Sequence, residues 1–254
     1  MTEYKIAIPS YRRADTLREK TLALLQRYKI PMGKIYIFVA SEAEKIEYLR
    51  AIPGQGLHYC KDIIVAKPGM MAVRNFIQSW FPEGQRVVNI DDDIEALKVR
   101  VNDYDCEELE DLDGLIQKGF SACEAVKASL WGVYPIVNPK FMYSRPTQDL
   151  RYIIGAFWGV INTHDKDTYV TMDDKEDFER TIKFYIRDGR VVRLNHVGIK
   201  SAYYTEPGGM QETRTEKRVR QSGMELLQKY PMFCEYNKAR KKHFEIRLVD
   251  KTRK

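Results

Sequence analysis

Residues 86–94 read Arg-Val-Val-Asn-Ile-Asp-Asp-Asp-Ile, an apolar segment that runs directly into three aspartates. Val87, Val88 and Ile90 can pair in the interior of a β-sheet. The carboxylates of Asp91–Asp93 cannot follow them into the core, because adjacent carboxylates repel one another and lose hydration on burial. The stretch therefore predicts a buried strand that ends at the mouth of a cleft.

The spacing within the triplet suggests a metal. Successive side chains of an extended chain point in opposite directions, so Asp91 and Asp93 should face the same way. Two carboxylates held like this suit a hard cation such as Mg²⁺ or Mn²⁺. The alternative is an acidic turn in which one aspartate caps the next segment. The triplet alone leaves both interpretations open.

Composition describes an ordinary globular chain. Its 254 residues are 44% hydrophobic and 31% charged, enough for one large domain with a sizeable core. The longest apolar stretch, 153–161, is too short to span a bilayer, and no secretory signal is evident, so we expect a cytoplasmic protein, in the host cytoplasm if a phage encodes it. The scattered cysteines predict reduced thiols rather than disulfides or a zinc site: Cys60, Cys106, Cys123 and Cys234.

The net charge of +6 is concentrated at one end of the chain. Residues 211–254 carry 13 Lys and Arg against 6 Asp and Glu, whereas the first 210 residues carry 29 against 30. Basic tails of this kind often bind polyanions, and many others are simply solvated. We expect phosphate contacts of nucleic acid from five residues of this segment: Lys217, Arg218, Arg220, Lys241 and Lys242.

Strand-like and helix-like segments alternate through the first half. The expected strands are 4–9, 35–39, 62–66 and 86–90, and the expected helices are about 16–28, 42–50 and 70–80. This alternation predicts right-handed βαβ units and an α/β fold with an open, mainly parallel sheet flanked by helices. No dinucleotide or Walker phosphate loop is present.

The second half predicts a less regular series of elements. A loop over 103–113 should lead into a helix over 114–130, strands over 133–138 and 152–162, a helix over 174–187, a short strand over 191–195, a basic helix over 213–230 and a strand over 244–249. We expect one domain over 1–210 and a basic C-terminal extension, 211–254, packed on it.

Two loops should border the same crevice as the aspartates, because ligands bind beyond the carboxyl ends of strands in open α/β sheets. In the first loop, Tyr11 could stack on a base, and Arg12 or Arg13 could pair with phosphate. In the second, Lys67 and Gly69 precede a helix whose N-terminus is a plausible anion site, with Arg74 and Asn75 one turn in. The alternatives are solvated arginines and an ordinary helix start.

A second acidic cluster occupies residues 172–180 (MDDKEDFER). Acidic residues in a first helical turn complement the helix dipole, which is one explanation. The other is that the cluster supplies a general base, for which Asp177 is the first choice and Asp174 the alternative. His196, at the end of the expected strand 191–195, is either a structural histidine or a further metal ligand.

Together these motifs resemble inverting, nucleotide-sugar-dependent glycosyltransferases of the GT-A fold. The matching pieces, within about residues 4–200, are IAIPSYRR, KPGMMAVRN, the DDD that stands for the family's DxD, and DDKEDF. The stretch LNHVGIKSAYYTEPGGMQETR looks most like phage transferases that accompany Tet/JBP-type hydroxylases. The resemblance implies transfer of a sugar from a nucleotide-sugar, a UDP-sugar by preference, to hydroxymethylated pyrimidines in DNA.

The resemblance also implies roles for particular residues. The residues expected to bind the nucleotide-sugar donor are Pro9, Ser10, Tyr11, Arg12, Arg13, Lys67, Gly69, Arg74, Asn75, Asp91 and Asp92. Mn²⁺ or Mg²⁺ would be held by Asp91, Asp93 and His196, and the acceptor would meet Phe157, Trp158 and Gly159. The large Asp92 departs from the small residue usual between the two functional aspartates. Other possibilities are a protein or glycan acceptor, nucleotidyl transfer, and a non-catalytic DNA-binding module, which two acidic clusters facing a polyanion disfavour.

Overall fold

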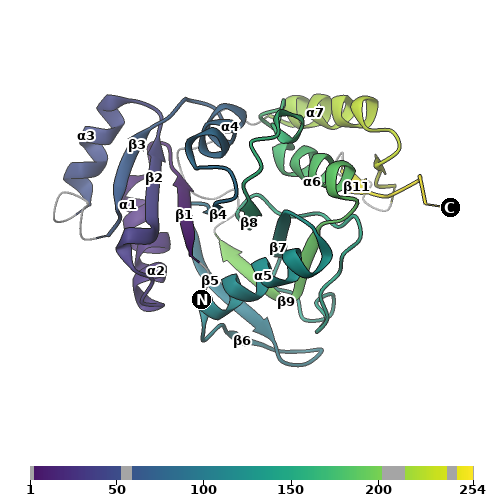
Figure 1. The fold of residues 1–254 in the computed structure, drawn as a ribbon, viewed down its shortest axis with the longest axis horizontal. Coiled ribbons are helices and arrows are strands. Elements are labelled where there is room, and N and C mark those ends of the chain that lie inside the picture. The colour runs from purple at the N-terminus through teal and green to yellow at the C-terminus, as the bar shows by residue number, and fades with distance from the viewer. Residues whose placement is uncertain (1–2, 53–58, 202–214, 239–244, 254) are drawn as a thin grey trace.

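The computed structural model describes residues 3–52, 59–201, 215–238 and 245–253. Its central sheet has nine strands in the order β3-β2-β1-β4-β8-β7-β9-β5-β6 (Figure 1). The first four in this order are parallel: β3 (Asp62–Val65), β2 (Ile35–Val39), β1 (Tyr4–Pro9) and β4 (Arg86–Ile90). The rest form a mixed half: β8 (Phe157–Ile161), β7 (Leu130–Tyr134), β9 (Val192–Ser201), β5 (Ile94–Arg100) and β6 (Cys106–Glu108).

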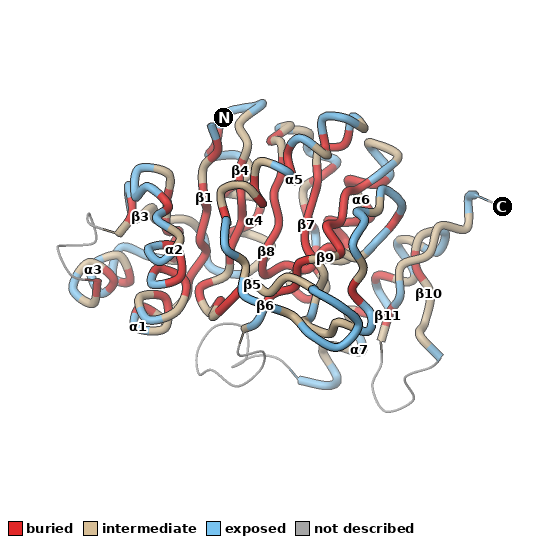
Figure 2. The backbone as a smooth tube through the Cα atoms, turned by 90° about the horizontal axis from the view of Figure 1, so that it is seen from below, coloured by how far each residue is buried: buried red, intermediate tan, exposed pale blue. Residues whose placement is uncertain are grey.

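Helices cover both faces of the sheet. One face packs against three successive helical segments, α1 (Ala14–Leu17), the π-helical η1 (Arg18–Leu22) and α2 (Ala23–Arg27), and against α3 (Glu42–Ala51) and α5 (Leu112–Val126). The other face packs against α4 (Met70–Trp80) and α6 (Glu176–Asp188). Short 3₁₀ turns lie at Met32–Lys34 and Lys166–Thr168. The inner strands of the sheet are buried between these layers (Figure 2), so the α/β fold class expected from the sequence is confirmed.

The C-terminal segment packs on α6. It contains α7 (Glu216–Lys229) and a small hairpin of β10 (Cys234–Tyr236) and β11 (Ile246–Leu248), and Figure 1 shows α7 beside α6. Leu226 of α7 and Ile246 of β11 join Ile182 of α6 in one apolar cluster. The hydroxyl of Tyr185 on α6 donates to Asp250 at 2.6 Å. All four cysteines are free, as expected. Among the described residues, no helix has both the length and the apolar character to cross a membrane.

The main departures from the expected elements lie beyond β4. Strands β5 and β6 were not expected, and residues 106–108 of the predicted loop pair with β5. Asp111 caps α5 by accepting a hydrogen bond from the Gly114 N–H at 2.8 Å, so this helix begins at Leu112 rather than 114. β9 continues to Ser201 instead of ending at Asn195, because its second half pairs with β5.

Candidate active site

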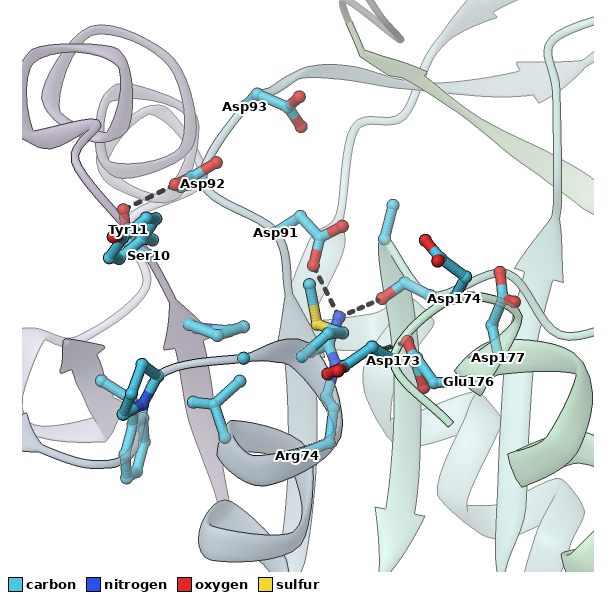
Figure 3. Close-up of a pocket in the computed structure, with 18 of the residues that line it drawn as sticks. Ser10, Tyr11, Arg74, Asp91, Asp92, Asp93, Asp173, Asp174, Glu176 and Asp177 are labelled. Carbon is cyan, nitrogen blue, oxygen red and sulfur yellow. Dashed lines mark hydrogen bonds and ion pairs between the residues drawn. The ribbon is translucent and has the colours of Figure 1, made fainter. Parts of the chain in front are cut away.

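A cleft of about 600 Å³ opens where β1, β4 and β8 meet the start of α6. Figure 3 shows that its acidic residues come from two separate parts of the chain. The first group, Asp91–Asp93, follows β4, and the second, Asp173, Asp174, Glu176 and Asp177, surrounds the N-terminus of α6. The sequence predicted both groups, and the fold brings them to one cavity.

The backbone of Asp91 is fixed by two distant segments. Its N–H donates to the Ala156 carbonyl at 2.9 Å, and its carbonyl accepts the Thr21 hydroxyl at 2.7 Å. The side chain, 31% exposed, accepts from Arg74 at 2.8 Å. Burial raises the pKa of Asp91, against the attraction of the Arg74 guanidinium.

Asp92 turns toward the loop after β1, whereas Asp91 turns toward Arg74 (Figure 3). The carboxylate of Asp92 accepts from the Ser10 hydroxyl at 2.6 Å and lies 3.4 Å from the Arg13 guanidinium. Burial raises the pKa of Asp92 to about 7. Asp93 lies 3.8 Å from the same guanidinium of Arg13. The middle aspartate therefore fastens the first loop of the cleft, whereas Asp91 is bonded to Arg74.

The candidate ligands for a metal ion in this cleft are the carboxylates of Asp91 and Asp93. In the described part of the chain no group of three or more His, Cys, Asp or Glu is arranged to hold one. A Mg²⁺-type ion is often bound through one or two carboxylates, while phosphates and water supply the other ligands. The residues present thus suit a metal that arrives with a diphosphate.

His196 is not part of this group. It lies in the middle of β9, five residues before Ser201, the residue of β9 that lines the cleft. At about 3.3 Å per residue the two are roughly 16 Å apart along the strand. Burial, with Lys118 nearby, lowers the pKa of His196. Its predicted role as a metal ligand is corrected: the strand continues past it and carries it away from the aspartates.

Arg74 connects the two acidic groups. Its buried guanidinium donates to Asp91 and, at 3.0 Å, to the Gly155 carbonyl, and its Nε lies 3.6 Å from Glu176. Glu176 in turn accepts from Arg180 at 2.6 Å. Burial raises the pKa of Glu176 and lowers that of Arg180, each opposed by the charge of its partner. A continuous chain of charges thus joins the end of β4 to the first turn of α6.

The ring of Trp158 packs against the two arginines of this chain of charges. The guanidinium carbons of Arg180 and Arg74 lie 3.9 and 5.8 Å from its ring centroid, and its indole N–H donates to the Gly155 carbonyl at 3.0 Å. Trp158 is only 6% exposed, Phe157 is fully buried, and a Cβ on Gly159 would meet the Trp131 ring at 2.2 Å. None of the three lines the cleft, so their predicted acceptor role is corrected.

The N-terminus of α4 already has an anionic partner. The Met71 N–H donates to Asp173 at 2.9 Å, and Gly69, with φ +96°, leaves room for this carboxylate, since a Cβ would lie 3.3 Å from it. Asp173 therefore takes the place that the sequence suggested for an external anion. Exposed Lys67 lines the cleft. Asn75 lies outside it and exchanges two hydrogen bonds with the Val170 backbone, at 2.8 and 2.9 Å. The prediction that Asn75 contacts the nucleotide-sugar is therefore corrected.

The loop after β1 supplies Pro9, Ser10, Tyr11 and Arg13 to the cleft, as expected. The Ser10 hydroxyl also contacts the Tyr48 hydroxyl at 2.7 Å, which joins this loop to α3. Arg12 is different. Its guanidinium carbon lies 4.9 Å from the Tyr11 ring centroid, and its backbone N–H donates to Glu44. Arg12 does not line the cleft, contrary to the expectation that it pairs with phosphate there.

The α6 side of the cleft is organised by two side chains for which the sequence predicted no such role. The Tyr152 hydroxyl donates to Asp177, and Arg218 of α7 forms an ion pair with buried Asp174. Lys175 enters the helix with a left-handed backbone, φ +64°. Only the Glu176–Arg180 pair had a sequence signal, its i,i+4 spacing on a helix. Tyr152 had none: the sequence placed it at the start of an expected strand, 152–162, but β8 begins at Phe157 and Tyr152 lies in an irregular segment before it.

The predicted DNA-contacting residues divide into three kinds. Lys217 and Arg220 are exposed on α7. Arg218 lines the cleft and pairs with Asp174, so it faces a carboxylate of the protein. Lys241 and Lys242 lie outside the described residues.

Comparisons with known proteins bear on the fold. No protein-family model and no curated protein matches the sequence. Among solved structures, the chain is similar to TarS 1–349 of Staphylococcus aureus in complex with UDP-GlcNAc, with a TM-score of 0.56, 14% identity, and coverage of 89% of this chain and 67% of that one. It is also similar to the mannosyltransferase PcManGT of Pyrobaculum calidifontis in complex with GDP-Man and Mn²⁺, with a TM-score of 0.57, 12% identity, and coverage of 89% and 64%.

These similarities show that the chain has the GT-A glycosyltransferase fold. The chain spans 66% of a second TarS 1–349 structure and 40% of another TarS structure, so parts of those proteins have no counterpart here. At 12–14% identity the likeness extends to the fold and not to the reaction.

Proposed function

We propose that the protein is a metal-dependent, inverting glycosyltransferase that uses a nucleotide-sugar donor. The observation that supports this most directly is the cleft itself, in which Asp91 and Asp93 face the carboxylates of the α6 N-terminus across one cavity of about 600 Å³. Sugar transfer requires a positive charge at the departing diphosphate and a base at the acceptor hydroxyl. Two separate carboxylate groups meet these two requirements.

On the donor side, the two aspartates would hold Mn²⁺ or Mg²⁺, which supplies positive charge to the diphosphate when bound. Tyr11, Arg13 and Lys67 line the same part of the cleft and would contact the nucleotide and its phosphates. Arg74, which is buried and bonded to Asp91, would hold that carboxylate in place. The two similar structures that contain UDP-GlcNAc or GDP-Man with Mn²⁺ support a nucleotide-sugar donor, and we favour a UDP-sugar.

On the acceptor side, Asp177 is the better candidate for the base. Asp174 also lines the cleft, but it is 5% exposed at its side chain and is neutralised by Arg218. Asp177 is bonded to the uncharged hydroxyl of Tyr152, and among the described residues its side chain forms no ion pair with an arginine. A free carboxylate is the form that accepts a proton from an attacking hydroxyl.

For the acceptor we propose a hydroxymethylated pyrimidine in DNA. The support is the resemblance of residues 194–214 to transferases of modified phage DNA, together with exposed Lys217 and Arg220 on the helix whose Arg218 lines the cleft. Positive charge beside the cleft would attract the phosphate backbone. A base in a duplex would have to leave the stack to reach Asp177.

The test is transfer itself. The protein is incubated with Mn²⁺, a panel of UDP- and GDP-sugars, and either plain or hydroxymethylated DNA, and the DNA nucleosides are analysed by mass spectrometry. A hexose or pentose mass added only to hydroxymethylated DNA is the expected result. Transfer to a glycan or peptide in parallel reactions, or pyrophosphate release from a nucleoside triphosphate, would redirect the assignment. DNA binding without turnover of any donor would contradict an enzymatic function.

A further inference from the structure

Tyr152 lies against the proposed base from the acceptor side of the cleft. It lines the cavity, and its ring stacks on Phe178 with centroids 4.3 Å apart and planes inclined by 30°. Its hydroxyl donates to Asp177, and its backbone carbonyl accepts from Arg193 at 3.3 Å. Ring, hydroxyl and backbone are therefore each held by a different neighbour, which leaves this side chain little freedom.

The carboxylate of Asp177 is fixed at both oxygens. Oδ2 accepts the Tyr152 hydroxyl, and Oδ1 accepts the Phe178 backbone N–H at 2.9 Å. A carboxylate oxygen has two lone pairs, so each oxygen keeps one for a further partner. The two contacts restrict rotation of the side chain without consuming its capacity to accept a proton.

We propose that Tyr152 is a positioning residue for sugar transfer, one that orients the Asp177 carboxylate toward the acceptor hydroxyl and does not itself exchange a proton. This inference rests on the proposed function. Burial and the adjacent carboxylate of Asp177 raise the pKa of Tyr152 well above its usual value, so its hydroxyl keeps its proton at neutral pH.

The proton balance is simple. The acceptor O–H bond breaks and its proton passes to the free lone pair of Asp177, while the acceptor oxygen forms a bond to the anomeric carbon of the sugar. The bond from that carbon to the diphosphate breaks, and the nucleoside diphosphate leaves with the electron pair. Tyr152 donates the same hydrogen bond before and after this step, to a carboxylate and then to a carboxylic acid.

The test compares Tyr152→Phe with Tyr230→Phe. Both remove a tyrosine hydroxyl that donates to a carboxylate of α6, but Tyr230 bonds Glu179 at 3.1 Å and does not line the cleft. We expect Tyr152→Phe to lower kcat about 10- to 100-fold with little change in the donor KM, because a misplaced base slows the chemical step. The acid limb of its pH–rate profile should move to higher pH, since a hydrogen bond that favours the charged carboxylate is lost. Tyr230→Phe should retain wild-type values.

The outcomes separate this inference from the proposed function. Wild-type kcat and pH profile in folded Tyr152→Phe would overturn the positioning role while leaving the transferase assignment intact. A wild-type protein that transfers no sugar would overturn the proposed function instead, and an Asp177→Asn variant with full activity would overturn the role of Asp177 as base and this inference with it. If Tyr152→Phe does not fold, Phe178→Leu loosens the same ring while keeping both hydrogen-bonding groups. It should then lower kcat in the same way, and unchanged kcat would count against the inference.

Discussion

The two sides of the cleft hold their carboxylates by different means. After β4, Asp91 and Asp92 point in different directions, and the backbone of Asp91 is bonded to Ala156 and Thr21. At the start of α6, Asp174 and Asp177 depend on side chains from other segments, Arg218 and Tyr152. The donor side is thus anchored through the backbone of Asp91, and the acceptor side through side-chain contacts between distant residues.

Arg74 is where the two sides meet, because its guanidinium contacts both Asp91 and Glu176. A perturbation of α6 can therefore reach the end of β4 through a few buried charges. The comparison is tested by changes on each side, which should affect different steps: metal and donor binding on the β4 side, and proton removal or helix stability on the α6 side.

The largest effect is expected on the β4 side. Asp93→Asn removes one of the two carboxylates available to a metal, so transfer and metal-dependent donor binding should be lost while the fold remains. Isothermal titration with a nucleoside diphosphate, with and without Mn²⁺, together with circular dichroism, measures both. Full activity of the wild-type protein in excess EDTA would contradict a metal requirement.

On the α6 side, Asp177→Asn should leave donor affinity unchanged and lower transfer by about 10²–10⁴-fold, the usual contribution of a general base. Initial rates and donor titrations on the same preparation separate the two effects. Asp174→Asn is the matched control, one turn earlier and neutralised by Arg218. The reverse pattern, an active Asp177→Asn and an inactive Asp174→Asn, would assign the base to Asp174.

The buried pair of α6 should matter for stability. Arg180 and Glu176 have side chains only 3% and 7% exposed, so Arg180→Met leaves a buried carboxylate with Arg74 alone, at 3.6 Å. Breaking a buried pair from one side typically costs about 3–5 kcal/mol in the free energy of unfolding, measured here by urea denaturation. Arg27→Met, which breaks a pair with Glu108 that is about half exposed at both side chains, should cost about 0–1 kcal/mol. Equal losses would mean that burial of the pair is unimportant.

How well the sequence predicted the fold also differs between two parts of the sheet. The parallel strands β1 to β4 are continuous apolar runs, and α4 has a clear apolar stripe, so both were placed within a residue or two. β5, β6 and the second half of β9 contain polar residues and depend on pairing with one another, which no local pattern reveals.

The site shows the same limit. Aspartates at the end of a strand and at the start of a helix can be recognised from the local sequence, and both groups line the cleft. An aromatic run such as Phe157-Trp158-Gly159 looks the same whether it lines a cleft or fills a core, and burial decided for the core. The contact between Tyr152 and Asp177 spans 25 residues and an irregular segment, so periodicity had no means of predicting it.

A smaller effect is expected at the surface beside the cleft. If α7 contacts DNA, Lys217→Gln and Arg220→Gln should each lower the slope of log K against log salt by about one, independently of sequence. Fluorescence anisotropy with hydroxymethylated and plain duplexes at several salt concentrations measures this. Lys61→Gln, an exposed lysine just before β3 at the opposite edge of the sheet, is the control and should leave the slope unchanged. Unaltered slopes in both α7 variants would exclude this helix as a phosphate-binding surface.

The smallest effect concerns His196, which the sequence placed in the metal site and the structure places in β9. Because burial lowers its pKa below the ordinary 6.5, the unfolded chain binds a proton more readily than the folded one as the pH falls. The contribution of neutral His196 to the free energy of unfolding is therefore fully present above about pH 6.5. It decreases as the pH falls toward the pKa of His196 in the folded state. His196→Gln should flatten this part of the stability–pH curve, measured by urea denaturation between about pH 5 and 7.5 without added metal. Metal-dependent donor binding should be unchanged in the same variant. If donor binding is lost while the pH dependence stays as in wild type, His196 belongs to the donor side of the cleft after all, and the division between the two sides is wrong at this position.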